Sequence, residues 1–495
     1  MEPSLPRESQ MPSRTLGQEL RQLLRLGVPI AGVQLGMTAL NFVDLAMLGR
    51  HDKASLPAMA LGSTIAWVAM MFCMGTVTAV DPLLSQAIGA RDSAAVPRLL
   101  GRGLLLALLL AIPASLLLLP AATWLAWCGQ PEELIPAAAS YAMLQALGIL
   151  PFLGYSVLRI VLSAHGRTAP QVWTIVAGNA ANAALDYVLV FGAFGLPAMG
   201  ATGAAIATVL CRWLMLFGLL AFGWRDFLPH LRALRDRAVR AEALALRPAL
   251  ALLRLGAPIG VQFVLELGVF AATALLVGTL DAAGAGTSGA RLGGHQITLQ
   301  LASLSFMVPL GLGMAASVRV GWAVGRGDRA AVRRTAEAAM LAAIVVMCGF
   351  MLLFLLAPAH LAGLLTDQQE QLAFAATLIP IAGVFQIGDG VQVVAIGCLR
   401  GLGDVRSPVL ANVLGFWVLG LPLGIWLGFA CGQGAAGLWW GLVLGLFAVA
   451  VALLLVLHWR SKTALTRLRV PGHPPTADAA EPGDDDERAS PPPPR

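Results

Sequence analysis

Long runs of apolar residues alternate with short polar connections along most of the chain. The apolar runs repeatedly approach or exceed about 20 residues, the length that an α-helix needs to cross roughly 30 Å of hydrocarbon. Few strand signals compete with this pattern, and only helices or closed barrels satisfy their backbone groups in lipid. The pattern therefore predicts an all-α integral membrane protein with about twelve transmembrane helices, near residues 26–49, 56–80, 101–123, 136–162, 169–191, 200–223, 255–279, 293–321, 335–357, 371–399, 407–428 and 434–457.

Basic residues are distributed unevenly among the connections between these runs. Arginines gather in the even-numbered connections, whereas the odd-numbered ones are nearly free of arginine and lysine, with Arg50, Lys53 and Arg291 as exceptions. Because short cytoplasmic loops carry the excess of basic residues, both termini are expected in the cytoplasm. The expected location is the plasma membrane, which in a bacterium is the inner membrane. The first run, 26–49, is too long for the apolar part of a signal peptide and is expected to be the first span.

Composition agrees with a membrane protein. Hydrophobic residues make up 58% of the 495 residues and charged residues 12%, and the mean hydropathy is +0.77, far above that of a soluble domain. The net charge of +6 could suggest nucleic acid, but the basic residues lie in short loops. Anionic membrane lipids, and no nucleic acid, are therefore the expected partners. The six cysteines are scattered without CxxC spacing, which favours small core residues over disulfides or a metal site.

The two halves of the chain resemble each other. Four short motifs recur in the same order at offsets between 229 and 238: LRLGVPI at 24–30 as LRLGAPI at 253–259, QAIGARD at 86–92 as WAVGRGD at 322–328, HGRTAP at 165–170 as GDVRSP at 403–408, and MGATG at 199–203 as QGAAG at 433–437. This recurrence predicts two six-helix lobes of the same topology with a central cleft between them. Such an arrangement is typical of an alternating-access transporter.

The chain divides accordingly into five parts. The connector between the lobes is rich in arginine and could hold a short surface helix, and the tail, ending in EPGDDDERASPPPPR, has nothing apolar to bury. The expected parts are an N-terminal cytoplasmic segment at 1–25, an N-terminal lobe at 26–224, a basic cytoplasmic connector at 225–254, a C-terminal lobe at 255–458 and a disordered cytoplasmic tail at 459–495.

Four acidic residues lie inside predicted spans, where inserting a charge costs roughly 2.5–3.5 kcal/mol. They are Asp44, Asp186, Glu266 and Asp389, in the first, fifth, seventh and tenth spans. Helical spacing places polar side chains on the same faces: Asn182 with Asp186, Gln262 with Glu266, and Gln386 and Gln392 with Asp389. Acids in such places tend to be functional, so these are the candidate site residues. Asp44 could instead be a satisfied residue near the outer interface.

The repeat allows these acids to be compared between the halves. At the offset of 229, Glu266 corresponds to Met37 and Asp44 to Thr273. The acids therefore do not match across the duplication, and each lobe has its own pair. This difference argues against a role in the shared scaffold.

Four stretches resemble the MATE family of multidrug and toxic compound extrusion transporters: TALNFVDLAMLGR in the first span, the GARD loop, PIGVQFVLELGVF in the seventh span and QIGDGVQVVAIGCLRGLGD in the tenth. The last two look most like its NorM-like branch, and the resemblance covers roughly residues 15–460. It implies two lobes that form a V and export of amphiphilic, often cationic compounds, driven by inward flow of Na⁺ or H⁺. No cofactor beyond that ion and no enzymatic activity are implied.

The resemblance also implies roles for the candidate residues. Glu266 and Asp389 would bind the coupling cation, as metal ligands if the ion is Na⁺, while Asp44, Asn182 and Asp186 match a site tied to proton coupling or substrate in other branches. Neutralisation of Glu266 and Asp389 would remove the counter-charge for a cationic drug. At Phe385 some relatives have tyrosine, and the missing hydroxyl leaves the choice of ion open.

Other residues and other functions complete the set of expectations. Methionine and aromatic side chains near the cleft could form an adaptable drug surface, although ordinary packing explains each of them equally well: Met37, Met70, Met71, Met74, Phe263, Phe306 and Met307.

A flippase of a lipid-linked precursor is the alternative function. Arginines would typically line its central cavity, whereas the interior here is acidic and Arg319 is the basic candidate. No HExxH, GxSxG or P-loop motif favours an enzyme, and a monomer is expected.

Overall fold

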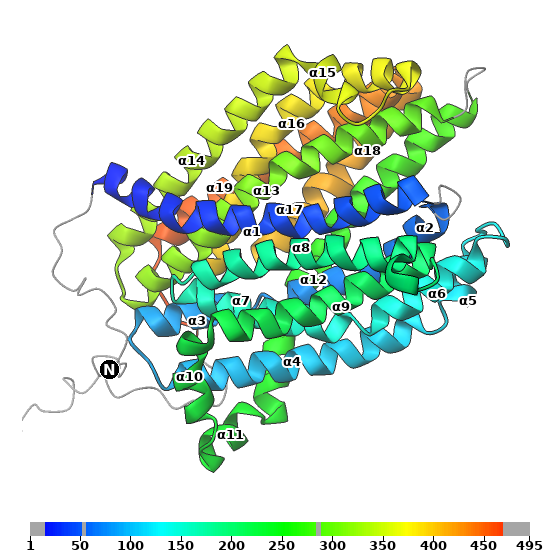
Figure 1. Cartoon of the computed structure of the whole chain (residues 1–495). Coiled ribbons are helices and arrows are strands. Elements are labelled where there is room, and N and C mark those ends of the chain that lie inside the picture. The colour runs from blue at the N-terminus through cyan, green and yellow to red at the C-terminus, as the bar shows by residue number, and fades with distance from the viewer. Residues whose placement is uncertain (1–14, 52–55, 284–288, 469–495) are drawn as a thin grey trace, which may run out of the picture.

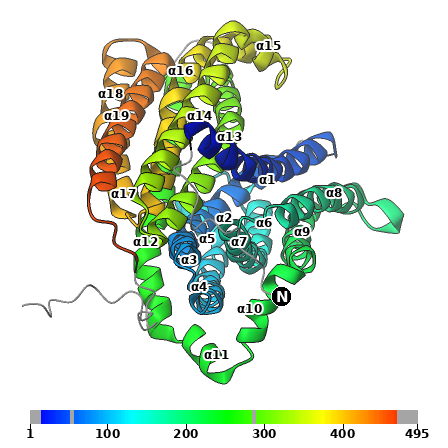
Figure 2. The ribbon, with the colours of Figure 1, turned by 90° about the vertical axis from the view of Figure 1, so that its left-hand side faces the viewer.

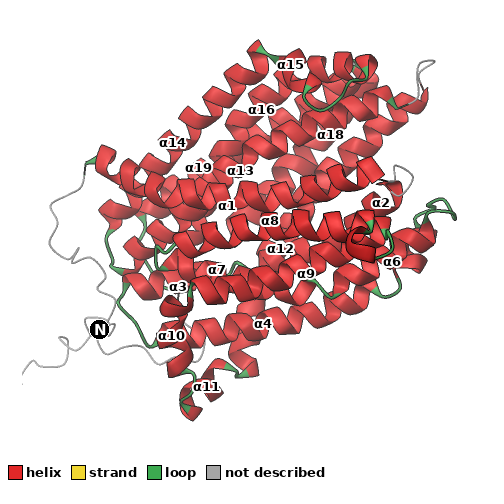
Figure 3. Ribbon diagram, in the orientation of Figure 1, coloured by secondary structure: helices red, strands yellow, loops and turns green. Residues whose placement is uncertain are grey.

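The computed structural model describes residues 15–51, 56–283 and 289–468, and all regular elements among them are helices (Figures 1 and 3). The α-helices are α1 (Leu16–His51), α2 (Leu56–Val77), α3 (Val80–Gly89), α4 (Ala95–Leu118), α5 (Ala121–Trp127), α6 (Ile135–Ala146), α7 (Ile149–Ala164), α8 (Ala169–Phe191), α9 (Gly200–Phe222), α10 (Trp224–Ala233), α11 (Arg237–Ala243), α12 (Leu246–Ala283), α13 (Ala290–Gly325), α14 (Arg329–Leu356), α15 (Pro358–Gly363), α16 (Gln369–Gly401), α17 (Arg406–Asn412), α18 (Leu421–Ile425) and α19 (Gly434–Lys462). A 3₁₀ turn spans Ala193–Gly195, and π-helical segments Val413–Gly420 and Trp426–Ala430 flank α18.

The described helices confirm the predicted all-α membrane fold. Eleven of their stretches are long and apolar enough to cross a membrane, and a twelfth is added if α6 and α7, bent by 43° at their junction, form one span. Large apolar side chains such as Leu116, Val345 and Leu455 remain 58%, 62% and 66% exposed. Exposure of this extent suits a surface in contact with lipid rather than water.

The helices form two groups, and the first helix of each half reaches into the opposite group (Figure 2). One apolar core is built mainly by α2–α9 and the other mainly by α13–α19. Leu23 and Ile30 of α1 are buried in the second core, whereas Leu252 and Ile259 of α12 are buried in the first. This exchange is reciprocal, as expected of two repeats related by a pseudo-twofold axis.

Glycines allow the two groups to approach closely along these exchanged helices. A Cβ atom at Gly311 of α13 would lie 2.5 Å from Cα of Ala31 in α1, and one at Gly75 of α2 would lie 2.7 Å from Cα of Gly260 in α12. Small residues permit this backbone contact, which is how membrane helices pack in the absence of a strong hydrophobic force. The two contacts are counterparts in the repeat, α1 with α13 and α12 with α2.

The two groups are joined by polar contacts at one end of the bundle, called here the basic end, where α3, α7, α13 and α16 finish. Gln86 Nε2 donates to the Gly401 carbonyl at 2.9 Å, and the indole N–H of Trp322 donates to the Ala164 carbonyl at 2.9 Å. The backbone N–H of Leu468 donates to Gln86 Oε1 at 2.7 Å. Each bond links a residue of the first half to one of the second half, so the groups are closed against each other at this end.

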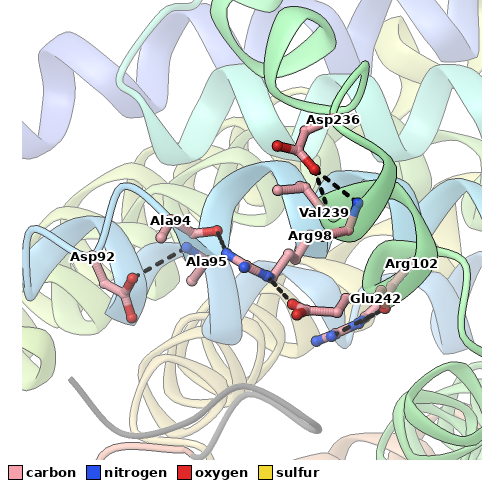
Figure 4. Close-up of polar contacts among 9 residues, drawn as sticks. Asp92, Ala94, Ala95, Arg98, Arg102, Asp236, Val239 and Glu242 are labelled. Atoms are coloured by element: carbon pink, nitrogen blue, oxygen red, sulfur yellow. Dashed lines mark hydrogen bonds and ion pairs between the residues drawn. The ribbon is translucent and has the colours of Figure 1, made fainter.

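The basic connector is fastened to α4 (Figure 4). Arg98 forms an ion pair with Glu242 at 2.5 Å, and Arg102 donates to the Glu242 carbonyl. Asp236 caps α11 by accepting from the N–H groups of Ala238 and Val239, the usual task of a carboxylate at a helix start. The predicted surface helix is thus present as two short helices, α10 and α11.

Helix ends extend beyond the predicted boundaries. α1 starts at Leu16, inside the segment predicted as 1–25, and α12 starts at Leu246, inside the connector. Residues 459–468 were expected in a disordered tail, but α19 continues to Lys462, and Arg460 and Arg467 pair with Asp404 and Asp92 at 2.9 Å each. That expectation is wrong for these ten residues because the two ion pairs hold them and Leu465 and Leu468 pack against the apolar cores. Residues 1–14 and 469–495, which contain the rest of both predicted terminal segments, lie outside the described residues.

Candidate functional site

The N-terminal candidates meet in one buried hydrogen-bond network. Asn182 Nδ2 donates to Asp44 Oδ1 at 2.6 Å and to Asp186 Oδ2 at 2.7 Å. Thr208 Oγ1 of α9 donates to the other oxygen of Asp44, Oδ2, at 2.7 Å. Asn182 and Asp186 are fully buried and Asp44 is 2% exposed. The network therefore joins α1, α8 and α9, and both oxygens of Asp44 are occupied by donors.

A cavity of about 340 Å³ lies next to this network and includes Thr208 in its wall. Both helix groups contribute to its lining: Thr38, Asn41, Phe42 and Leu45 of α1, Met59, Ala60, Ser63, Ala66, Trp67 and Met70 of α2, Tyr141 and Gln145 of α6, Thr208 and Arg212 of α9, and Gln300 and Ser303 of α13. Of the methionine and aromatic residues expected at a drug surface, Met70 is in this wall; the other six are not among its described lining residues. The size and the mixed lining are those of a small-molecule site.

The C-terminal candidates are brought together across α12 and α16. Gln392 Nε2 donates to Glu266 Oε1 at 3.2 Å, and the charge of Glu266 acts on Asp389. Asp389 is 7% exposed and takes part in no hydrogen bond among the described residues. Gln386 is fully buried, yet neither of its amide atoms has a partner, and Gln392 Oε1 also has none. The predicted polar faces of α12 and α16 thus meet, and several of their hydrogen-bonding atoms have no partner among the described residues.

Gln262 does not bond to Glu266, as its helical spacing suggested, but to Arg400. Arg400 Nη2 donates to Gln262 Oε1 at 3.2 Å, and its guanidinium lies 5.2 Å from the centre of the Phe263 ring. The charge of Arg400 interacts with Glu266 on α12 and also with Asp81 on α3 of the first half. Asp81 is held by Ser317 of α13, whose hydroxyl donates to Oδ2 at 2.6 Å. A line of buried polar groups therefore connects the C-terminal acids to the contact between the halves.

The donor set of the C-terminal acids fits a small hard cation or a proton. Among the described residues no group of three or more His, Cys, Asp or Glu side chains could hold a metal ion. Two carboxylates and the unpartnered amide oxygens of Gln386 and Gln392 would nevertheless offer oxygen ligands, which hard cations prefer. Phe385 has no side-chain oxygen to add to this set. Its ring packs against those of Phe270 and Trp439, with 6.1 Å between ring centres in each pair.

Arg319, the basic candidate of the eighth predicted span, forms an ion pair rather than lining the cavity. Its Nη2 lies 2.5 Å from Oε1 of Glu19 on α1, and the hydroxyl of Thr335 donates to the same oxygen at 2.7 Å. These contacts tie α1 to α13 and α14. The paired side chains of Arg319 and Glu19 are 10% and 5% exposed, and the ion pair accounts for the arginine structurally.

Sequence reasoning missed three residues that the fold brings into play. Thr208 gives no signal of its own, because its partner Asp44 is far away in the chain. Asp81 lies in the extension of the second span and was not distinguished from a loop residue. Arg212 did carry a signal, since a lone arginine inside the apolar run 200–223 is costly in lipid and is therefore a functional candidate.

Solved structures with the same fold are membrane transporters. The eukaryotic MATE transporter AtDTX14 superposes with a TM-score of 0.79 at 22% identity, covering 91% of this chain and 98% of that one. The Vibrio cholerae MATE transporter VcmN in its bent form gives 0.78 at 18% identity, covering 90% and 98%. Together with the paired helix groups and their buried acids, this likeness defines a multi-pass membrane protein with a transporter fold.

Sequence comparison then places the chain within a family. The family model MatE matches residues 29–188 and 258–426, and the two starts differ by 229 residues, the offset at which LRLGVPI recurs. The probable multidrug resistance protein NorM of Bradyrhizobium diazoefficiens is 38% identical, covering 92% of this chain and 96% of that protein. NorM of Burkholderia vietnamiensis is 36% identical, with 90% and 95% covered. The chain belongs to the MatE family, and its relatives are transporters rather than enzymes.

Proposed function

We propose that this chain is an antiporter of the bacterial inner membrane that exports amphiphilic, often cationic compounds in exchange for Na⁺ or H⁺. The multidrug resistance proteins among its relatives support the export function. One observation carries the antiport mechanism: the partly unbonded acids Glu266 and Asp389 lie in one helix group, and most of the cavity wall lies in the other. An ion site and a substrate site can then be loaded in different states of the transporter.

In this mechanism the coupling ion acts on the C-terminal acids. Na⁺ or H⁺ neutralises Glu266 and Asp389, which relieves the repulsion between two carboxylates in a poorly solvated place. Neutral Glu266 no longer attracts Arg400, and Arg400 then interacts more strongly with Asp81 in the other half. The ion thereby changes the contact between the halves at the basic end. A ligand can shift two conformations only through such a difference in interaction.

The cavity binds the exported compound. Its aromatic and methionine side chains suit varied apolar bodies, and the charge of Asp44 behind Thr208 favours a cationic group nearby. Neither Glu266 nor Asp389 is among the described lining residues, so direct competition between ion and drug for these two carboxylates is not part of the proposal. Coupling passes between the helix groups instead, and it must be reciprocal, with bound ion weakening bound drug.

The proposal also states how the protein is oriented in the membrane and which partners surround it. The basic end faces the cytoplasm, because the exposed arginines Arg225, Arg232, Arg235, Arg237 and Arg240 belong to the connector there. Anionic lipid headgroups are the partners expected for these side chains. A single chain contains both acid clusters and the cavity, which supports a functional monomer.

The flippase alternative is favoured by one observation, the presence of Arg212 in the cavity wall. A cavity of about 340 Å³ is nevertheless small for a lipid-linked precursor and suits a drug-sized compound. The 36–38% identity to NorM proteins over most of the chain also supports drug export. Efflux of small amphiphiles is therefore the preferred function.

The test is dye efflux from proteoliposomes under a sodium gradient or a proton gradient imposed separately. Export driven by one of the two gradients is expected for the wild type and should be lost in Glu266→Gln and Asp389→Asn. Glu337→Gln is the matched control, because Glu337 is exposed and its ion-pair partner in the described part of the chain is Arg333 on the same helix. Efflux that responds to neither gradient would refute secondary antiport.

A further inference from the structure

After α19 the chain crosses from the second helix group to the first at the basic end. Residues 463–468, called here the strap, have no regular secondary structure, and Figure 2 shows them in red, leaving the end of α19 toward the first group. Just before the strap, Arg460 pairs with Asp404 of the second half at 2.9 Å. Within it, Leu465 packs against the second core and Leu468 against the first. The strap therefore spans the contact between the two groups.

Two polar contacts fasten the far end of the strap to the first half. Arg467 Nη2 lies 2.9 Å from Oδ2 of Asp92, and these side chains are 26% and 4% exposed. The backbone N–H of Leu468 donates to Oε1 of Gln86 at 2.7 Å, and Gln86 is fully buried. Loss of this bond would leave a buried amide oxygen without a partner, which is costly.

The tip of the strap lies between the two halves. Leu468 lies over Gly403 of the second half, where a Cβ atom would stand 2.9 Å from its Cγ. Gly403 has φ +86°, a conformation that glycine adopts without strain. On the other side, Gln86 donates to the Gly401 carbonyl at 2.9 Å while it accepts from Leu468. The halves cannot separate at this point without breaking one of these contacts.

The repeat shows that the bond to Gln86 is an addition to the shared scaffold. Gln86 corresponds to Trp322 in the second half, and each side chain donates one hydrogen bond across the halves, to the carbonyls of Gly401 and Ala164. An indole has a donor only, whereas the amide of Gln86 also has an acceptor oxygen. That additional acceptor is the atom to which Leu468 donates.

The ion pair at Asp92 is an addition of the same kind. Asp92 corresponds to Asp328, and each caps the helix that follows it, by accepting from the N–H of Ala95 at 3.1 Å and of Ala331 at 2.8 Å. Asp92 also pairs with Arg467, whereas Asp328 forms no ion pair in the described part of the chain. The helix caps and the bonds across the halves thus exist in both repeats, and the strap adds contacts on one side only.

We propose that the strap regulates opening of the basic end: it holds the two halves closed there and detaches from Gln86 and Asp92 in each transport cycle. The proposal rests on the proposed antiport, because alternating access requires this end to open. A contact made in one of two conformations shifts the equilibrium toward that conformation. The strap therefore favours the state that is closed at the basic end and slows its opening.

A buried reporter measures this opening without any transport. Ser85 of α3 is fully buried, and a Cβ atom at Gly321 of α13 would lie 2.5 Å from its Cβ, so it lies where the halves meet. In a full-length chain whose six native cysteines are replaced by alanine, Ser85→Cys reacts with a maleimide when the basic end opens. We expect Arg467→Gln to speed labelling roughly threefold, and Leu468→Pro, which has no N–H to donate, roughly tenfold.

Two further substitutions within the strap are the controls. Thr466 is exposed, and its N–H takes part in no hydrogen bond among the described residues, so Thr466→Pro adds a proline without removing a contact. It should label at the wild-type rate. Arg467→Lys keeps the charge and should recover most of the loss in Arg467→Gln. Labelling of Arg467→Gln and Leu468→Pro at the rate of Thr466→Pro would overturn the proposal.

A reversible tether tests whether the strap must detach. Cysteines at positions 467 and 92 of the same cysteine-free chain are joined by a flexible bifunctional thiosulfonate reagent. We expect the tether to lower gradient-driven dye efflux by roughly tenfold or more, and a reductant to restore it. Arg467→Cys alone, treated with the reagent, should be unaffected by it. Full efflux of the tethered protein would overturn the requirement for detachment.

The two measurements separate this proposal from the export function. Labelling of Ser85→Cys needs neither a gradient nor a dye. A protein whose labelling responds to the strap variants as expected, but which shows no driven efflux with or without the tether, would overturn antiport and leave the closing role of the strap supported. Driven efflux with labelling that ignores the strap variants would overturn the strap's role alone.

Discussion

The two acid clusters differ in how completely their oxygens are bonded. In the N-terminal group, each oxygen of Asp44 accepts a short hydrogen bond, and Asn182 links it to Asp186. Asp186 Oδ1 has no partner among the described residues, so the saturation is that of Asp44 and not of the whole cluster. In the C-terminal group, Glu266 accepts one bond of 3.2 Å and Asp389 none among the described residues. A saturated carboxylate is held in one geometry, whereas an unsaturated one retains capacity for an incoming ion. The difference supports the proposal that Asp44 is held in position while Glu266 and Asp389 bind the ion.

The repeat makes this comparison sharper. Thr273 occupies the place of Asp44 in the second half, and among the described residues its hydroxyl bonds only to the Val269 carbonyl of its own helix, at 2.9 Å. Met37 occupies the place of Glu266 in the first half. The duplicated scaffold is therefore preserved, while the residues at these two polar positions differ between the halves.

Loss of the ion site should have the largest effect. In Glu266→Gln and in Asp389→Asn the initial rate of gradient-driven dye efflux is expected to fall by roughly 100-fold, or about 2.7 kcal/mol in activation free energy. The reason is that an amide carries no negative charge for the coupling ion to bind and cancel. The measurement is stopped-flow dye fluorescence in proteoliposomes with matched protein content. A loss smaller than about threefold in both variants would break the assignment.

Interruption of the link between the halves should have the next largest effect. Arg400→Gln and Asp81→Asn are expected to lower driven efflux by roughly tenfold, because the C-terminal acids then lose their electrostatic connection to α3. Downhill dye flux without an ion gradient should change much less. The ratio of driven to undriven flux is the readout, and Ser85→Ala, which removes a 3.4 Å bond to Asp81, is the control with little expected change. Equal loss of both fluxes would point to a folding defect instead.

Two threonines at different kinds of hydrogen bond test how much the bond to the Asp44 carboxylate contributes to stability. Thr208→Val removes a 2.7 Å bond to the Asp44 carboxylate, so we expect a loss of about 1.5–3 kcal/mol in stability, as is typical of bonds to charged groups. Thr273→Val removes only a bond within its own helix and should cost about 1 kcal/mol or less. Thermal unfolding in detergent measures both. Similar losses at the two positions would show that the bond from Thr208 to Asp44 contributes no more to stability than a bond within one helix.

A pH effect outside the membrane must be separated from the effect of the acids. Burial, with the neighbouring charge of His165, lowers the pKa of His230 in α10 to about 4, below the usual value of 6.5. Between these values the unfolded chain binds more protons than the folded one, so stability falls as the pH is lowered through this window. We expect a decrease in Tm of roughly 2–4 °C that is absent in His230→Gln. If the dependence of Tm on pH is the same in His230→Gln as in the wild type, the buried carboxylates and not His230 cause it.

The fold was predictable because each span carries its own signal, whereas the site was predictable only in part. Apolar runs of membrane-spanning length and the repeat at 229 residues indicate helices and halves without reference to distant residues. Buried acids stand out for the same reason. Which neighbour each acid bonds depends on how helices rotate against one another: Gln262 turns to Arg400, Gln392 turns to Glu266, and Thr208 reaches Asp44 from another helix. Spacing along one helix cannot reveal such contacts.

The most direct test of the division between ion site and drug site is the affinity for dye at equilibrium, measured with and without the coupling ion. Reciprocal coupling predicts that the ion weakens dye binding to the wild type. In Glu266→Gln the dye should still bind, with the affinity of the ion-loaded wild type and without any response to the ion. Complete loss of dye binding in Glu266→Gln would contradict this account, because it would place the dye at the carboxylate that we assign to the ion.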